Sequence, residues 1–286
     1  MAARFRVKYG TLVNGRVPEA VSPAVMLHVR EEGTGDPVLL LHGLGGDHTV
    51  WDFVIPTLSK SYRVLAPDLR GHGRSPFPEG ARYSFEELEG DVQKLLDDRH
   101  VGPAHVVGLS GGGLLALRML IDDPGRVRSL ALLGAAGHLD NHTRAVGQNW
   151  ADTLRDEGPE AYARRLAMDL FSPDWLEAHL DLAKRIANSQ KGRNLRGVVQ
   201  WGVSMGTFDV RPRLGRVKTP TLILHGLEDN VVDPSHARLL RQAIPGSEVR
   251  LFPNTGHLIP IERPEETTQI LLEWFGRQST ARVSTA

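Results

Sequence analysis

Short apolar runs recur along the chain and alternate with longer stretches whose apolar positions have helical spacing. Most runs are continuous Val, Leu and Ile segments, which is typical of strands buried on both faces of a parallel sheet. We predict eight strands, near Phe5–Val13, Ala24–Val29, Val38–Leu41, Arg63–Ala66, His105–Leu109, Ser129–Leu133, Thr221–Leu224 and Glu248–Phe252. We predict helices near Phe85–Asp98, Gly111–Ile121, Ser235–Ala243 and Pro264–Phe275. The pattern indicates an α/β fold with a mostly parallel eight-stranded sheet, helices on both faces, and the first two, less apolar strands at an antiparallel edge.

The alternation stops between Ala136 and Leu214, where no convincing strand pattern occurs. Helical patterns occupy this stretch, near Ala145–Glu157, Pro159–Leu170, Pro173–Ile186 and Asn194–Met205. A structureless connection of this length is uncommon inside a compact domain, so we predict a folded helical unit. The predicted organisation is a core domain of residues 1–135 and 215–277, a helical unit of residues 136–214, and a disordered polar tail at residues 278–286.

The segment from His105 to Gly113 carries the strongest chemical signal in the chain. It contains Gly108-Leu109-Ser110-Gly111-Gly112, which fits the pattern G-x-S-x-G between a β-branched run and a helix-forming run. A sharp turn between a strand and a helix strains the serine backbone and exposes the serine oxygen at the end of a sheet. The pattern therefore predicts that Ser110 is a nucleophile.

Partners for this serine follow later in the chain. Asp229 lies three residues after Gly226, at the end of an apolar strand, and His257 comes just after the last predicted strand. The neutral imidazole of a histidine can take the serine proton, and a carboxylate can orient that imidazole. Glu228 and Asp233 lie close to Asp229, and either could be the acid partner instead.

A glycine-rich turn, His42-Gly43-Leu44-Gly45-Gly46, follows the buried strand at Val38–Leu41. Such a turn can offer a backbone N–H to a developing oxyanion, and we predict the N–H of Leu44 for this role. The second donor is the N–H of Gly111, because the residue after the serine opens a helix whose first N–H groups have no partner. We expect His42 to have a structural role in this turn.

Composition narrows the range of functions. The 286 residues include 34 basic and 34 acidic ones, so no net charge attracts nucleic acid or an anionic membrane. The chain has no cysteine, which excludes disulfides, a thiolate nucleophile and a cysteine-ligated metal. The first ten residues, MAARFRVKYG, contain no apolar segment, so we do not expect a signal peptide. The chain has no apolar run of about 18 residues and no histidine spacing typical of a metal site. We therefore expect a cytoplasmic protein with no cofactor, no metal, and no nucleic-acid or membrane partner; the sequence leaves open whether it forms a homo-oligomer.

These ordered motifs resemble the α/β-hydrolase superfamily, in particular its esterases, lactonases and C–C hydrolases that need no cofactor. Serine, acid and histidine follow one another in that family's order, and the run Tyr62–Ser75 is similar to its strand-and-turn signature. The resemblance covers roughly residues 24–276 and implies that residues 136–214 form a helical cap. It favours Asp229 as the acid, because its distance from Gly226 matches the family's Gly-x-x-Asp spacing.

The resemblance implies a carboxylesterase that cleaves small or medium carboxylic esters through an acyl-enzyme. Leu109 and Leu258 flank the serine and the histidine, so we expect them to contact substrate, and Trp201 is a further candidate for the pocket wall. Three alternatives stay open: a C–C hydrolase of diketone or dienoate ring-cleavage products, an enol-lactone hydrolase, and a ligand-binding, receptor-like protein with little turnover. We expect a structural turn network from four polar residues, which are Asp68, Arg70, His72 and Ser75.

Overall fold

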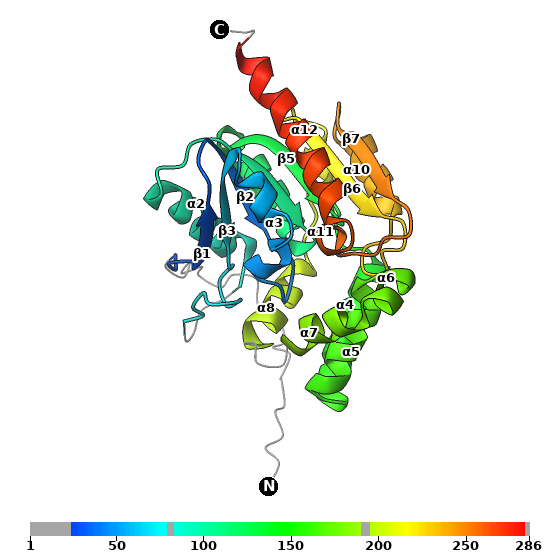
Figure 1. Cartoon of the computed structure of the whole chain (residues 1–286). Coiled ribbons are helices and arrows are strands. Elements are labelled where there is room, and N and C mark those ends of the chain that lie inside the picture. The colour runs from blue at the N-terminus through cyan, green and yellow to red at the C-terminus, as the bar shows by residue number, and fades with distance from the viewer. Residues whose placement is uncertain (1–23, 79–82, 190–194, 284–286) are drawn as a thin grey trace.

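The computed structural model describes residues 24–78, 83–189 and 195–283. A seven-stranded sheet with the order β1-β3-β2-β4-β5-β6-β7 forms its centre (Figure 1). The strands are β1 (Val29–Glu32), β2 (Asp36–Leu41), β3 (Tyr62–Pro67), β4 (Ala104–Leu109), β5 (Val127–Leu133), β6 (Thr221–Gly226) and β7 (Glu248–Phe252). All neighbouring pairs are parallel except β1 with β3. The α/β fold with a mostly parallel sheet is confirmed, and the predicted strand at Phe5–Val13 lies outside the described residues.

The edge strand β1 differs from its prediction. We predicted a strand near Ala24–Val29, but the ladder with β3 begins at Val29, which pairs with Pro67, and ends at Glu32, which pairs with Val64. In the segment before Val29, side chains alternate between buried and exposed positions as in a strand, but no β-ladder forms there. The segment therefore has the burial pattern of a strand without the pairing of one, which is why the predicted strand lies too early in the chain.

Helices cover both faces of the sheet. The helices α2 (Phe85–Asp98), α3 (Gly111–Asp122) and α10 (Ser235–Ala243) share one hydrophobic cluster, and α1 (Ile55–Leu58) and α12 (Pro264–Val283) share the other. Strand residues alternate between the two clusters, so that Leu39 belongs to the first and Leu40 to the second. This alternation explains why the central strands β4, β5 and β6 are mostly apolar, as expected for strands buried on both faces, whereas the edge strands β1 and β7 are only partly buried.

A helical insertion, which we define as α4 to α8, lies between β5 and β6 and packs beside one end of the sheet (Figure 1). Its helices are α4 (Asn141–Asp156), α5 (Pro159–Leu170), α6 (Pro173–Ala178), α7 (Leu180–Ser189) and α8 (Leu195–Met205). The predicted helix Pro173–Ile186 is interrupted at His179, whose backbone is not helical. The His179 ring stacks on Trp175 and its Nδ1 lies 3.0 Å from the Trp175 carbonyl oxygen. The backbone N–H of His179 donates to the same oxygen at 2.9 Å, so the last helical bond of α6 is made. The helix ends there because the φ of −128° and ψ of 33° of His179 lie outside the helical region.

The remaining elements are short, and they are η1 (His48–Trp51), η2 (Pro124–Arg126), α9 (Arg211–Leu214) and α11 (Ile259–Glu262). The disordered tail predicted from Gln278 is wrong at its start, because α12 continues to Val283. Residues 277–283 contain neither glycine nor proline, so nothing in the local sequence ends the helix. Within the part of the chain that the structure describes, none of the helices has the length and apolar character needed to cross a bilayer.

Candidate active site

Ser110 occupies the sharp turn between β4 and α3. Its φ of 55° and ψ of −121° lie where residues other than glycine are rarely found. A Cβ on Gly108 would lie 2.5 Å from the Gly112 carbonyl oxygen, and one on Gly112 would lie 2.3 Å from the Leu41 carbonyl oxygen. Only glycine permits this approach of strand and helix, which holds Ser110 half-buried at the end of the sheet. The predicted turn geometry is confirmed.

His257 and Asp229 form a buried pair after β7 and β6. The Nδ1 atom of His257 lies 2.7 Å from Oδ2 of Asp229, while Oδ1 accepts the N–H groups of Val231 and Val232, each at 2.9 Å. Burial alone would raise the pKa of Asp229, but the charge of His257 and hydrogen bonds from His225 and His257 hold it well below its usual value. A carboxylate can only accept hydrogen bonds, so Nδ1 of His257 carries the proton and Nε2 is left as an acceptor.

The three acids that the sequence left open have different partners in the structure. Asp229 contacts His257, whereas Asp233 is exposed and accepts the N–H of Ser235. Glu228 is half-buried, and its backbone N–H donates to the carbonyl oxygen of Thr255 at 2.9 Å. The geometry therefore supports Asp229 as the partner of His257.

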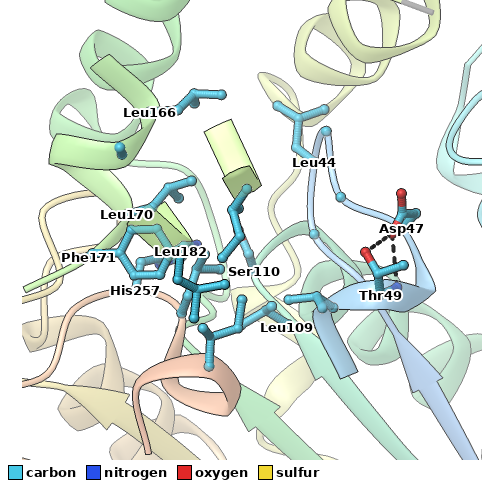
Figure 2. A pocket seen from close by; sticks show the side chains of 18 of the residues that line it. Leu44, Asp47, Thr49, Leu109, Ser110, Leu166, Leu170, Phe171, Leu182 and His257 are labelled. Carbon is cyan, nitrogen blue, oxygen red and sulfur yellow. Dashed lines mark hydrogen bonds between the residues drawn. The ribbon is translucent and has the colours of Figure 1, made fainter. Parts of the chain in front are cut away.

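Ser110 and His257 line one cavity of about 310 Å³, which we call the first cavity. Figure 2 shows Ser110 between Leu44 on one side and Leu170 with His257 on the other. Leu109 and Leu258 also line this cavity, as expected for residues that flank the predicted nucleophile and base. The remaining walls come from two parts of the chain, the segment of residues 43–53 and the helical insertion. The side of the insertion is largely apolar and includes Leu166, Leu170, Phe171, Leu182 and Ile186.

A second cavity of about 300 Å³ lies beside the first. The two share four lining residues, which are Leu44, Ser110, Trp150 and Tyr162. Gly111 lines only the second cavity, whereas His257 lines only the first. Ser110 therefore stands at the junction of two apolar spaces, with the histidine on one side and the start of α3 on the other.

The turn that carries Leu44 is held by His42. The Leu69 N–H donates to Nε2 of His42 at 2.9 Å, so the proton sits on Nδ1, which donates to the Gly43 carbonyl oxygen at 2.8 Å. Since the C=O and N–H of one planar peptide point in opposite directions, this bond directs the Leu44 N–H away from His42. A Cβ on Gly43 would lie only 2.9 Å from Cβ of Ser110, so the turn packs directly against the serine. This arrangement suits the predicted oxyanion role of Leu44.

Trp201 has a different place from the one predicted. Its side chain is 0% exposed and lines neither of the two cavities. The ring packs against His42, His72 and Tyr83, and a Cβ on Gly111 would come within 3.0 Å of it. Trp201 therefore packs against the turn that carries Ser110 and does not line either cavity. The sequence shows that a tryptophan is apolar but not which surface it covers.

The predicted turn network is present. Asp68 accepts the N–H groups of His48 and Arg74, each at 2.8 Å, and Ser75 donates to the Asp68 carbonyl oxygen at 2.5 Å. Nδ1 atoms of His28 and His48 also contact the Asp68 carboxylate, and the potential ligand atoms of these three residues lie within 4.8 Å of one another. A metal ion could be held only here among the described residues, but the carboxylate is already engaged by backbone N–H groups, which favours a hydrogen-bonded network.

Two other members of this network act elsewhere. Arg70 forms a bidentate pair with Asp91, at 2.6 and 2.8 Å, and both side chains are buried. His72 accepts the N–H of Gly45 at 3.1 Å and so supports the turn that carries Leu44.

Two residues near the pair of His257 and Asp229 were missed at the sequence level. His225 is buried beside Asp229, with its Nε2 3.3 Å from Oδ2 of Asp229 and 2.9 Å from the Val232 carbonyl oxygen. Glu262 is buried beside the loop that carries His257, which we call the histidine loop, and it accepts hydrogen bonds from Ser172 and Gly256. The position of His225 next to Gly226, four residues before Asp229, could have indicated that it lies close to Asp229. Nothing local in the sequence pairs Glu262 with Ser172.

The mostly parallel sheet and the sharp turn at Ser110 agree with the result of the family comparison. The family model described as "alpha/beta hydrolase fold" matches residues 36–264, and the chain belongs to this family. The protein is a hydrolase of the α/β-hydrolase type.

Relatives within the family differ in activity. The chain is 29% identical over 257 residues to a putative carbamate hydrolase, RutD, of Stutzerimonas stutzeri, covering 88% of this chain and 96% of that protein. It is 29% identical over 266 residues to a 2-hydroxy-6-oxo-2,4-heptadienoate hydrolase of Pseudomonas putida, covering 88% and 94%.

Two solved structures are also similar. A thermophilic esterase from Thermogutta terrifontis has a TM-score of 0.80 and 28% identity, covering 88% of this chain and 93% of that one. The enol-lactonase from Burkholderia xenovorans has a TM-score of 0.81 and 28% identity, covering 87% and 96%.

Proposed function

We propose that this protein is a serine hydrolase that cleaves small to medium carboxylic esters through an acyl-enzyme on Ser110. One observation carries the proposal: Ser110, in a strained strand–helix turn, shares a cavity with His257, whose Nδ1 is held by Asp229 at 2.7 Å. A serine hydroxyl needs a neighbouring base to become a nucleophile, and a histidine in this tautomer can be that base.

The reaction follows from these positions. Oγ of Ser110 attacks the ester carbonyl carbon while Nε2 of His257 takes the hydroxyl proton, and Asp229 stabilises the imidazolium that forms. The tetrahedral intermediate then collapses: the C–O bond to the alcohol breaks, and His257 returns its proton to the departing oxygen. Water attacks the acyl-enzyme with the same proton transfers and releases the acid and free Ser110.

The developing oxyanion needs donors that are in place before the reaction. We assign this role to the backbone N–H groups of Leu44 and Gly111, on either side of Ser110. Gly111 is the first residue of α3, where an N–H has no acceptor within the helix and the helix dipole favours negative charge. Loss of one such donor typically lowers kcat by about 100- to 1,000-fold.

The two cavities support an ester with apolar groups on both sides of the scissile bond. His257 must protonate the leaving oxygen and lines only the first cavity, so the alcohol portion belongs there. The acyl portion then extends into the second cavity, past Gly111 toward Leu114 and Met205. On this view the helical insertion, residues 136–214 in the predicted domain scheme, is a cap that supplies most of the wall of the second cavity and part of the wall of the first.

Other substrates of the same machinery stay open. The names of the relatives point to carbamates, dienoates and enol-lactones, and Ser110 could attack a carbonyl of each with His257 as the base. An unsubstituted carbamate would leave most of two apolar cavities of about 300 Å³ unfilled, which favours a larger substrate. The cytoplasmic location and the absence of a cofactor also stay predictions.

The test is hydrolysis of p-nitrophenyl esters from acetate to dodecanoate, with the Ser110→Ala variant measured in parallel. The proposal expects an optimum at one acyl length and a loss of several powers of ten in the variant. Enol-lactones, ring-cleavage diketones and N-alkyl carbamates complete the panel. If one of these is turned over and no ester is, the ester assignment is wrong; if nothing is turned over, the receptor-like alternative gains support.

A further inference from the structure

The chain segment Leu170–Ser172, which joins α5 to α6, runs directly beside the loop that carries His257. The carbonyl oxygen of Leu170 accepts two consecutive N–H groups of that loop, from His257 at 3.0 Å and from Leu258 at 3.2 Å. The helical insertion is therefore hydrogen-bonded to the backbone of the predicted base itself.

A single buried carboxylate joins the same two pieces of chain a second time. Glu262 accepts Oγ–H of Ser172 at 2.5 Å and the Ser172 N–H at 3.2 Å, and it accepts the Gly256 N–H at 3.0 Å. Ser172 belongs to the insertion and Gly256 immediately precedes His257. Hydrogen bonds to a carboxylate are about twice as strong as neutral ones, so this junction holds both segments in place.

The two segments are in direct contact at this junction. A Cβ on Gly256 would lie 2.6 Å from the backbone nitrogen of Ser172 and 2.8 Å from Oε1 of Glu262. The hydrogen bonds above hold both neighbours in place, so neither can move away without breaking one of these bonds. The loop before His257 therefore has little freedom to move relative to the insertion.

The same segment also faces the substrate space. The side chains of Leu170 and Phe171 line the first cavity together with His257 (Figure 2). We propose that the Leu170–Ser172 segment positions His257 for catalysis, with Ser172 and Glu262 as positioning residues that act through the histidine loop. This inference rests on the proposed hydrolase function and adds that the insertion sets the alignment of the base as well as enclosing substrate.

Two substitutions loosen the junction without removing a group that touches substrate. Ser172→Ala deletes the hydroxyl donor, and Glu262→Gln keeps the size of the side chain but removes its charge. A displacement of about 1 Å at a reacting group can cost about 100-fold in rate, so kcat for the best p-nitrophenyl ester should fall about 10- to 100-fold while KM changes little. The double variant should lose no more than the worse single variant, because both changes open one junction.

Matched controls separate this role from ordinary structural damage. Ser247 is 1% exposed, like Ser172 at 0%, and its Oγ bonds the Ile244 carbonyl oxygen at 2.8 Å away from both cavities. Glu87 is 4% exposed, like Glu262 at 5%, and belongs to the capping box of α2. Ser247→Ala and Glu87→Gln should therefore lose comparable stability and retain kcat.

Amide hydrogen exchange of His257 and Leu258 gives a readout that does not depend on turnover. Exchange of these two amides should be faster in Ser172→Ala and Glu262→Gln than in either control. Unchanged exchange together with a kcat equal to that of the controls would overturn the inference, as would an equal fall of kcat in all four variants. If the wild-type protein hydrolyses no ester, the proposed function fails, and the exchange measurement still decides whether the segment holds the histidine loop.

Discussion

Replacing Asp229 by asparagine changes one atom and should nearly abolish hydrolysis. Oδ1 of Asp229 accepts two backbone N–H groups, from Val231 and Val232, each at 2.9 Å. An asparagine must place its oxygen at this position, because an amide NH₂ there would face two donors. The NH₂ group is then directed at His257.

The consequence falls on the tautomer of the histidine. In the wild-type protein Nδ1 of His257 donates to Oδ2 of Asp229 at 2.7 Å. In the variant, Nδ1 faces an NH₂ group and must accept a hydrogen bond from it. The proton then moves to Nε2, which can no longer take the proton of Ser110. The corresponding loss in a serine–histidine–acid triad is about 10⁴-fold in kcat, or about 5.4 kcal/mol of transition-state stabilisation.

The assay is steady-state hydrolysis of the best p-nitrophenyl ester, with circular dichroism to verify folding. Asp233→Asn makes the same chemical change four residues later, at an exposed carboxylate that bonds Ser235, and should retain wild-type turnover. Activity of Asp229→Asn within tenfold of wild type would refute the tautomer argument, and a severe loss in Asp233→Asn would place the acid elsewhere.

Three further predictions concern stability, each measured by urea denaturation. Arg70→Leu leaves the Asp91 carboxylate buried without its guanidinium partner and should lower the free energy of unfolding by about 3–5 kcal/mol. Arg155→Leu, at an exposed ion pair, should leave the free energy of unfolding nearly unchanged. Burial and the nearby carboxylate of Asp122 raise the pKa of Glu89 from 4.5 to about 7, so the folded state loses stability as the pH rises through this range. Glu89→Gln should therefore stabilise the protein at about pH 8 but not at about pH 4. Equal effects at both pH values would contradict this prediction. Gly90→Ala in α2, where a Cβ would meet nothing within 4 Å, should stabilise by about 0.5–1 kcal/mol, and a destabilised variant would show that α2 is packed differently.

The core of the site could be predicted because its signals are local. The elbow around Ser110 depends on glycines within two residues of it, where strand and helix approach within van der Waals contact. His257 and Asp229 each follow a parallel strand, and the carboxyl ends of parallel strands meet at one edge of the sheet, so chain order and strand pattern were enough to bring them together.

The remaining features depend on contacts between distant parts of the chain. Trp201 was assigned to the pocket because it is a large apolar residue of the insertion, but only the packing of α8 against the histidines decides which surface it covers. Ser172 and Glu262 are separated by 90 residues, and no periodic pattern links them. The division of the substrate space at Ser110 likewise arises from the arrangement of the insertion helices over the sheet.

The most direct test of the central claim is mass spectrometry of the protein quenched in acid during turnover of p-nitrophenyl butyrate. The account predicts one added butyryl group, located on the peptide that contains Ser110 and absent in the Ser110→Ala variant. Turnover without any adduct, accompanied by hydrolysis at near wild-type rate in Ser110→Ala, would contradict the assignment of Ser110 as the nucleophile.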